Sequence, residues 1–249
     1  MNIVVLGSGT SVPRLDRNMS GYLLEVGKKN ILFDSGPGTI RQLLKLKVNF
    51  LDIDDIFYTH LHNDHINDLP AIIWGNNYGT FRKKALNLYV PVGFKKYFDI
   101  LIKKIMKPIK LTYAVKIKEM KNNSIAKLSN NLTVKSIKSK HTENSVSYRI
   151  EHNNKSIVYS GDSDYSRNII KLSKNTDLLI LECSFPDNEK VEGHLTSSLC
   201  GRIAAKANVK KLVLTHFYPE CDKVDIKKQC SKEFDGKIIL AKDFMKINV

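Results

Sequence analysis

Short apolar runs separated by polar turns dominate the first half of the chain, and this spacing predicts strands joined by tight loops. Strands are predicted for the apolar runs at residues 1–7, 22–26, 30–33, 56–58 and 86–90. Gly27-Lys28-Lys29 reads as a hairpin turn between two of these strands. Amphipathic spacing predicts helices over residues 40–46 and 94–106, and Asp68 with Pro70 marks the capped start of another.

The second half repeats one design, in which each β-branched apolar run leads to a single side chain with metal or proton chemistry. Residues 132–137 lead to His141, 156–161 to Asp162, 178–181 to Glu182 and 211–215 to His216. If these strands lie side by side in one direction, their carboxyl ends share one edge of a sheet. Six of the seven histidines then fall at or beside that edge, and only His152 does not.

Strands and helical patterns occur in both halves of the chain, without a linker, an internal repeat or a low-complexity segment. This organisation predicts an α+β fold in which two mixed β-sheets pack face to face with helices outside, an αββα sandwich. A chain of this length fits one domain with a sizeable core or two small domains, and without a linker we expect a single domain over residues 1–249.

Three imidazoles and a carboxylate lie close together in one predicted strand-to-helix loop, at His60, His62, Asp64 and His65. Neutral imidazole and carboxylate are ligands that borderline divalent metals accept. His60 and His62 alternate by two and can share one ion, whereas Asp64 and His65 are displaced round the turn and can reach a second. The alternative is a solvated polar loop, but packing does not explain so dense a cluster.

This HxHxDH pattern resembles that of the metallo-β-lactamase-fold hydrolases. The resemblance implies a dinuclear centre similar to that of the phosphodiesterase branch. His60, His62 and His141 would bind one ion, and Asp64, His65 and His216 the other. Asp162 would bridge the two, because a carboxylate has two oxygens. Lactamases proper usually carry a cysteine at that position, so Asp162 argues against a lactamase.

Further segments look like those of ribonuclease Z, the endonuclease that trims tRNA precursors at the 3′ end. They are residues 6–10 with Pro13, 17–18, 34–39, 59–65, 160–162, 193–197 and 214–217. The resemblance implies an RNA phosphodiesterase with two divalent ions, expected to be zinc although manganese or iron also suits the ligands, and a homodimer. A metal-bridging hydroxide would attack the phosphorus.

Four residues are candidates for roles in the reaction or in support of the metals. Asp64 would bind one ion and orient or deprotonate the nucleophile, and His194, which matches a proton donor of ribonuclease Z, would protonate the leaving oxygen. A capping or packing histidine is the structural alternative for His194. Glu182 would orient His194 or act as a ligand. Asp34, at a strand end facing the same edge, either orients a ligand or forms a turn or helix cap.

One departure from ribonuclease Z concerns the arm that grips tRNA, which the family inserts between the third histidine and the bridging aspartate. His141 and Asp162 are only 21 positions apart here, and the residues between them read as one hairpin. Leu195 also stands where the family commonly has serine. A second hypothesis is therefore a phosphodiesterase for small cyclic or aryl esters. A third is a metal-dependent nucleic-acid-binding or sensing module without turnover.

Composition bears on the partner. The formal net charge is +15, from 40 basic and 25 acidic side chains, and such an excess favours a polyanion such as RNA. The most basic stretch, residues 95–121, is the candidate phosphate contact, with a solvated face as the alternative. The 33 lysines against 7 arginines also fit a compositional bias of the genome.

The remaining expectations concern compartment and one loop. No run suits a membrane span or a secretory leader, and the four cysteines lack CxxC spacing, so we expect a cytoplasmic protein with free thiols. The loop over residues 7–13, Gly7-Ser8-Gly9-Thr10-Ser11-Val12-Pro13, either presents backbone N–H groups to an anion or forms a plain tight turn.

Overall fold

The computed structural model of the protein describes residues 1–79, 82–107 and 109–249, and over these residues the chain forms two seven-stranded β-sheets. The first sheet comprises, in spatial order, β14 (Lys246–Asn248), β1 (Asn2–Gly7), β2 (Gly21–Val26), β3 (Lys29–Ser35), β4 (Asp55–Phe57), β5 (Leu86–Val90) and β6 (Val115–Glu119). The second comprises β13 (Lys237–Leu240), β12 (Lys211–Thr215), β11 (Leu178–Glu182), β10 (Lys155–Tyr159), β9 (Val146–His152), β8 (Leu132–Lys138) and β7 (Ile125–Ser129).

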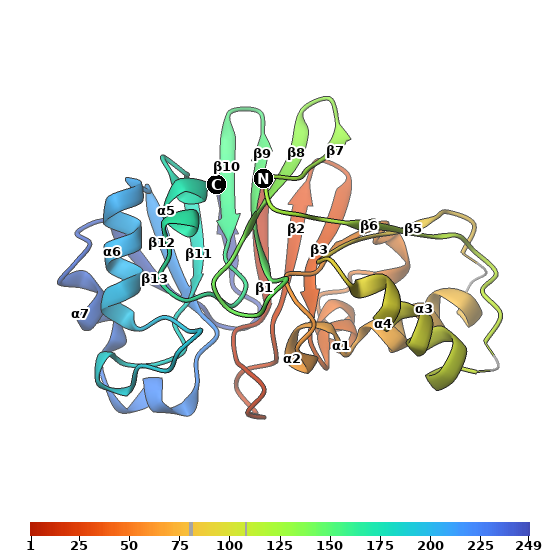
Figure 1. Ribbon diagram of the computed structural model, residues 1–249, viewed down its shortest axis with the longest axis horizontal. Helices are drawn as coiled ribbons and strands as arrows, with labels where there is room; N and C mark the ends of the chain where they lie inside the picture. The colour runs from red at the N-terminus through yellow and green to blue at the C-terminus, as the bar shows by residue number, and fades with distance from the viewer. Residues whose placement is uncertain (80–81, 108) are drawn as a thin grey trace.

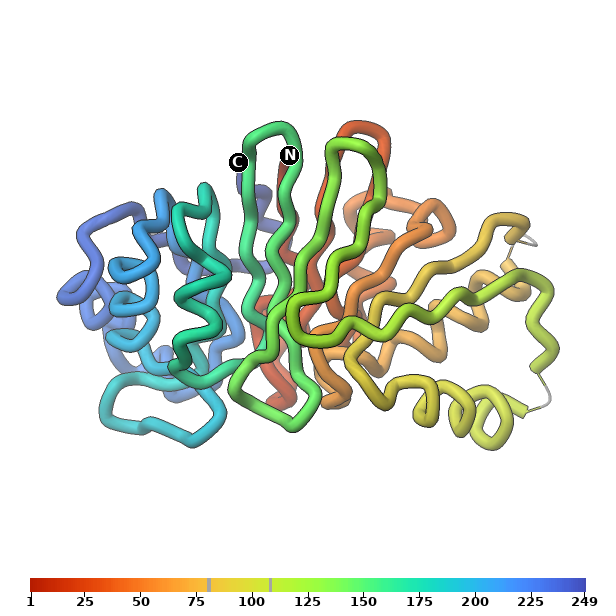
Figure 2. Tube along the Cα trace, turned by 45° about the horizontal axis from the view of Figure 1, so that its top comes forward, coloured from red at the N-terminus to blue at the C-terminus, as the bar shows by residue number. Residues whose placement is uncertain are grey.

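Helices cover the outer faces of both sheets (Figure 1), and the turned view of Figure 2 shows the helices of the two halves at opposite sides of the molecule. Those of the first half are α1 (Thr39–Lys45), α2 (Asn63–Ile66), α3 (Leu69–Tyr78), α4 (Phe94–Ile100) and the short turns η1 (Phe50–Asp52) and η2 (Leu101–Ile105). Those of the second half are α5 (Arg167–Ser173), α6 (Ser197–Ala207), α7 (Ile226–Ser231), η3 (Asp187–Glu189) and η4 (Pro219–Lys223). The predicted αββα layers are confirmed. No helix among the described residues is long and apolar enough to cross a lipid bilayer.

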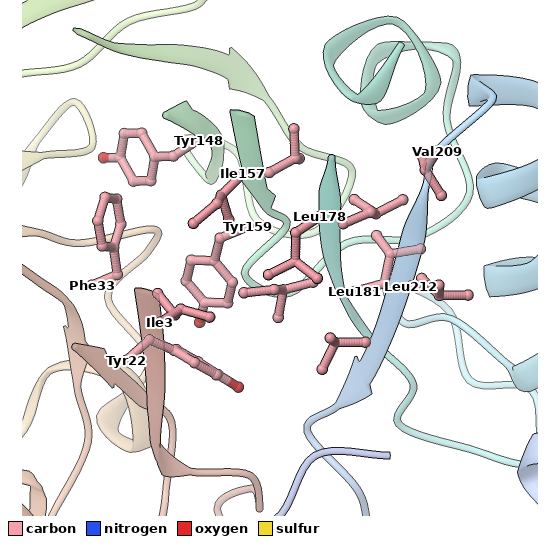
Figure 3. Close-up of a cluster of buried hydrophobic side chains, with 14 of the residues drawn as sticks. Ile3, Tyr22, Phe33, Tyr148, Ile157, Tyr159, Leu178, Leu181, Val209 and Leu212 are labelled. Carbon is pink, nitrogen blue, oxygen red and sulfur yellow. The ribbon is translucent and has the colours of Figure 1, made fainter. Parts of the chain in front are cut away.

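Alternation along the strands explains why both faces of the first sheet are apolar. Tyr22 and Leu24 of β2 point into the core between the sheets, whereas Leu23 belongs to the core beneath the helices. Tyr22 meets Tyr159 of the second sheet with ring centroids 4.7 Å apart, and Figure 3 shows both rings between the sheets. Full burial of each such side chain contributes roughly 1.5–3 kcal/mol.

Strand direction places the chemistry-bearing loops at one edge of the molecule. β10, β11 and β12 are parallel, and β8 shares their direction because β8 and β10 are both antiparallel to β9. The predicted common edge of the second sheet is thereby confirmed. In the first sheet β3, β4 and β5 are parallel, and the histidine loop follows β4. His152 lies away from this edge, at the end of β9 beside the hairpin turn.

Two local expectations need correction. The predicted helix over residues 94–106 is α-helical only to Ile100 and continues as a π-helical turn, η2. Asp68 has helical backbone angles, so its carboxylate does not cap α3. It accepts hydrogen bonds from the N–H groups of Gly38 (3.1 Å) and Ile40 (2.7 Å) at the start of α1.

The loop after β1 is a structural turn at the two positions whose amides are accounted for. Ser8 N–H donates to Asp243 Oδ1 at 3.0 Å, and Gly9 N–H donates to the carbonyl oxygen of Asn18 at 2.9 Å. Because both donors are satisfied within the protein, neither is available to an anion.

Candidate metal centre

The first four candidate ligands come from the loop between β4 and α2. His62 has extended backbone angles and immediately precedes α2, so Asp64 and His65 lie on the first turn of that helix. His60, Asp64 and His65 are buried, whereas His62 is exposed. The loop is held close to the strand-end turn at Gly36, where a Cβ atom would lie 2.0 Å from the carbonyl oxygen of Asp64. Only glycine permits that approach.

The other candidates come from separate strand ends of the second sheet. His141 follows β8, Asp162 follows β10, and His216 follows β12. The structure brings the predicted ligands into two groups whose ligating atoms lie within 4.8 Å of one another. The first group is His60, His62, His141 and Asp162, and the second is Asp64, His65 and His216.

Asp162 stands between the two groups. Its Oδ2 atom lies 3.6 Å from His60 Nε2 and 3.7 Å from His141 Nε2. Its Oδ1 atom lies 3.1 Å from His65 Nε2 and 3.4 Å from His216 Nε2. Each oxygen thus faces one group, which is the arrangement expected of a bridging carboxylate.

Oxygen atoms behind the imidazoles fix which ring nitrogens face inward. His65 Nδ1 donates to Asp34 Oδ2 at 2.8 Å, and His141 Nδ1 donates to the carbonyl oxygen of Gly193 at 3.0 Å. His216 Nδ1 lies 3.0 Å from Ser184 Oγ. The Ser184 hydroxyl donates to Glu182 Oε2, so its oxygen accepts from His216 Nδ1. With the proton on Nδ1 in all three residues, the lone pair on Nε2 points toward the other imidazoles.

These Nε2 atoms face other nitrogen lone pairs rather than hydrogen-bond donors. His65 Nε2 lies 3.4 Å from His216 Nε2, and His141 Nε2 lies 3.1 Å from His62 Nδ1. His60 Nε2 and Asp162 Oδ1 are buried without a hydrogen-bond partner. Converging lone pairs and an unpaired carboxylate oxygen repel one another unless cations lie between them. The donor set therefore fits divalent metal ions.

The charge states of two candidate ligands, His60 and Asp162, suit metal binding. Burial, reinforced by the neighbouring His65, lowers the pKa of His60 well below its usual value, which keeps the imidazole neutral. Burial alone would raise the pKa of Asp162, but His216, His65 and His60 hold it well below the usual range. Neutral imidazole and ionised carboxylate are the forms that bind metals.

Asp34 contacts His65, a candidate ligand. Of the two roles predicted for Asp34, this contact matches orientation of a ligand rather than a turn or a helix cap. Besides His65, its Oδ2 atom accepts hydrogen bonds from Thr59 Oγ1 at 2.9 Å and from the Tyr159 hydroxyl at 2.7 Å. Thr59 and Tyr159 were not among the predicted site residues. Adjacency to His60 was a signal for Thr59, whereas Tyr159 carried none beyond its place at a strand end.

His194 lies beside the centre and is held by Glu182. Its Nδ1 donates to Glu182 Oε1 at 2.9 Å, and a ligating atom of His194 lies within 4.8 Å of ligating atoms of Asp162 and His216. Burial lowers the pKa of His194, but the hydrogen bond and charge of Glu182 raise it above the usual value. Of the two roles predicted for Glu182, the contact matches orientation of His194.

Glu182 is itself fixed on every side. Its Oε1 atom also accepts from Ser163 N–H, and its Oε2 atom accepts from Leu195 N–H at 3.0 Å and from Ser184 Oγ at 2.7 Å. Sequence reasoning missed Ser184, although it lies two residues after Glu182. Its hydroxyl contacts Glu182, His194 and His216 and so ties the three together.

Comparison with known proteins agrees with this geometry. A family model described as "Anti-Pycsar protein Apyc1" matches residues 1–236. The ribonuclease Z of Archaeoglobus fulgidus is 27% identical over 99% of this chain and 97% of its own length.

Two solved structures are similar along their whole length. Human tRNase Z, short form, is 26% identical with a TM-score of 0.84, covering 100% of this chain and 99% of that one. The metallo-β-lactamase fold protein YhfI from Bacillus subtilis is also 26% identical, with a TM-score of 0.83 and coverage of 99% and 98%. The predicted fold and resemblance are confirmed. The chain belongs to the anti-Pycsar protein Apyc1 family and is a ribonuclease Z-like, metal-dependent hydrolase with the metallo-β-lactamase fold.

Proposed function

We propose that this protein hydrolyses phosphodiester bonds of RNA with two divalent metal ions, zinc first among them. The observation that carries the proposal is the convergence of seven ligating side chains from two sheets, with His194 held beside them. The ligands are His60, His62 and His141 for one ion, Asp64, His65 and His216 for the other, and Asp162 for both. Manganese or iron would suit the same nitrogen and oxygen atoms.

Bound metal ions would lower the pKa of water and neutralise charge on the phosphate. Asp64, whose Oδ2 atom lies 3.3 Å from His216 Nε2 within the same candidate ligand group, would orient the attacking water. The raised pKa of His194 keeps its imidazole protonated to higher pH, so Nε2 can donate a proton to the leaving oxygen. Glu182 holds that ring at Nδ1 and stabilises the imidazolium.

Support for RNA comes from the relatives and from charge. The similar proteins include a ribonuclease Z and a tRNase Z. The net charge of +15 favours a polyanion. In Figure 1, helix α4, whose sequence includes Lys95 and Lys96, lies in the lower part of the view, as does α2, whose sequence includes Asp64 and His65, and this is consistent with a phosphate contact near the candidate metal centre.

A second candidate is hydrolysis of a compact cyclic or aryl phosphodiester. The hairpin of β9 and β10 between His141 and Asp162 turns at Asn153-Asn154, both with positive φ, and leaves no arm there. The alignment with the A. fulgidus enzyme runs over 305 positions although this chain has 249 residues. That relative therefore carries segments without a counterpart here. The matching family model is also not described as a ribonuclease.

The test is a cleavage assay with a 3′-extended tRNA precursor, run beside bis-p-nitrophenyl phosphate and a 3′,5′-cyclic nucleotide, with zinc or manganese. Cleavage at the 3′ boundary, abolished by Asp64→Ala, would support RNA as substrate. Hydrolysis of the small esters alone would support the second candidate. If the metal-loaded protein hydrolyses none of them and binds RNA in a salt-sensitive way, the proposal is wrong and a binding module remains.

We also propose a homodimer in the cytoplasm. Resemblance to ribonuclease Z supports the dimer. Four buried free cysteines suit a reducing compartment. Light scattering after gel filtration would measure the mass, and a monomeric mass at micromolar concentration would contradict the dimer.

A further inference from the structure

Two aromatic side chains stand beside the metal centre without belonging to its ligand groups. Phe185 follows Ser184, and Tyr218 lies two residues after His216. Their rings are stacked, with centroids 4.7 Å apart and 18° between the planes. Both side chains are only partly buried. A stacked pair with surface open to solvent can accept another flat ring.

The pair adjoins the two imidazoles at this end of the centre. The Tyr218 ring lies 6.0 Å from that of His216 and 6.2 Å from that of His194, centroid to centroid. The imidazoles of His194 and His216 are nearly parallel, at 15°, whereas Tyr218 stands at 70° and 77° to them. The rings therefore form a corner with one imidazole wall and one aromatic wall.

Backbone contacts fix this corner. Tyr218 N–H donates to the carbonyl oxygen of Ser184 at 3.3 Å, and Cys221 N–H donates to the carbonyl oxygen of Tyr218 at 3.0 Å. Ser184 also contacts the imidazoles of His194 and His216 through its hydroxyl. The aromatic wall thus keeps its position relative to His194, the residue that faces the leaving oxygen in the proposed reaction.

We propose that Tyr218, backed by Phe185, stacks on the nucleobase of the leaving nucleoside. The inference rests on the proposed function, because protonation of the leaving oxygen by His194 brings that nucleoside next to Tyr218. Stacking tolerates every base, since each has a π face. The aromatic wall would therefore favour nucleotides over base-free phosphodiesters without choosing among bases, and it would serve a nucleoside at an RNA chain or in a compact ester alike.

The experiment measures binding rather than turnover. Metal-loaded protein is titrated calorimetrically with uridine monophosphate, as its 3′ and 5′ isomers, and with methyl phosphate. We expect Tyr218→Leu to weaken binding of the better isomer by about 5- to 150-fold and to leave methyl phosphate affinity unchanged. Tyr218→Phe should bind both ligands like the wild type, because the ring is retained. Phe185→Leu should show a smaller selective loss.

Tyr78→Leu is the matched control. Tyr78 is exposed and pairs with Trp74, with ring centroids 5.5 Å apart, on α3. Metal content and melting temperature are measured for every variant. Three results would overturn the inference. Tyr218→Leu could lose affinity for both ligands equally or for neither of them. Alternatively, the wild-type protein could bind uridine monophosphate no better than methyl phosphate.

The two proposals fail separately. Selective nucleotide binding that depends on Tyr218, in a protein that hydrolyses no phosphodiester, would refute the proposed function and leave the aromatic wall in place. Hydrolysis together with unchanged affinities in Tyr218→Leu would refute the aromatic wall alone.

Discussion

The two sheets build their shared catalytic edge in different ways. The first sheet delivers His60, His62, Asp64 and His65 from a single loop after β4, whereas the second delivers each side chain from the end of a different strand. A contiguous loop fixes its ligands by local backbone geometry. The dispersed set depends on strand order and direction, so it forms only when the whole sheet has folded.

The sheets also meet at a point where side-chain volume is excluded. Gly161 has φ +55°, and a Cβ there would lie 2.6 Å from the Cβ of Thr59. Thr59 precedes the histidine loop and Gly161 precedes Asp162. The carboxylate of Asp162, the proposed bridge, therefore reaches the candidate ligands of the first sheet because glycine lets the two strand ends approach closely.

The largest effect is expected at Asp162, because both groups of candidate ligands depend on this residue. Asp162→Ala should lose both ions, because each carboxylate oxygen faces one group. His62→Ala should lose ion from one group only, since His62 belongs to the first alone. Activity in Asp162→Ala should fall by more than the roughly 100-fold that loss of a supporting residue costs. Metal content by mass spectrometry and phosphodiesterase rates check both.

Equal metal stoichiometry in the two variants would contradict the assignment of Asp162 as the bridge. His152→Ala is the matched control, because His152 lies at the far end of β9, where its Nδ1 donates to the carbonyl oxygen of Asn131 and its Nε2 accepts from Asn153 Nδ2. It should keep full metal content.

This contrast also explains how far sequence reasoning reached. The histidine loop could be recognised from the sequence because its candidate ligands are neighbours in the chain. The candidate residues at the strand ends of the second sheet were predictable because apolar runs indicate strands, and parallel strands bring their carboxyl ends together. Side-chain partners that cross between sheets have no such signal. Tyr159 reaches Asp34 across 125 positions of sequence, and the position of Asp68 before a helix gave no hint that it caps a different one.

The next largest effect concerns pH and tests whether Glu182, at a strand end of the second sheet, controls the pKa of His194. Glu182 raises the pKa of His194 above its usual value, so the protonated acid persists to higher pH and activity falls as pH rises through that pKa. In Glu182→Gln the charge is gone and burial lowers the pKa. The alkaline limb of kcat/KM should therefore move to lower pH, by about one unit for each 1.4 kcal/mol of lost interaction.

The check is a full pH–rate profile with a phosphodiester substrate, with metal content measured at each pH. A limb that stays in place while the rate falls uniformly would assign Glu182 a purely structural role. Ser163→Ala serves as the control. Its backbone N–H still donates to Glu182 Oε1 and its side chain does not contact His194, so its alkaline limb should match that of the wild type.

A smaller effect tests the contact that joins the sheets behind the ligands. Tyr159→Phe removes one of three donors to Asp34 Oδ2 and leaves those from His65 and Thr59. We expect metal affinity to fall by roughly tenfold, at the low end for residues that support ligands. Competition with a chelator measures the affinity. Tyr148→Phe is the control, because the Tyr148 hydroxyl donates to the backbone carbonyl oxygen of Tyr58 rather than to Asp34.

The smallest effect is expected at the edge opposite the candidate metal centre, where charged side chains of the second sheet form an ion pair that does not contact the candidate ligands. Lys210 Nζ donates to Asp177 Oδ1 at 2.7 Å, and 70% of the Lys210 side chain is exposed. In Lys210→Ala the carboxylate keeps its bond from Ser156 N–H at 2.8 Å. The free energy of unfolding in urea should therefore fall by less than about 1 kcal/mol. Metal content and kcat should not change. A loss of activity there would mean that the two ends of the sheet are coupled, because this ion pair does not contact the ligands.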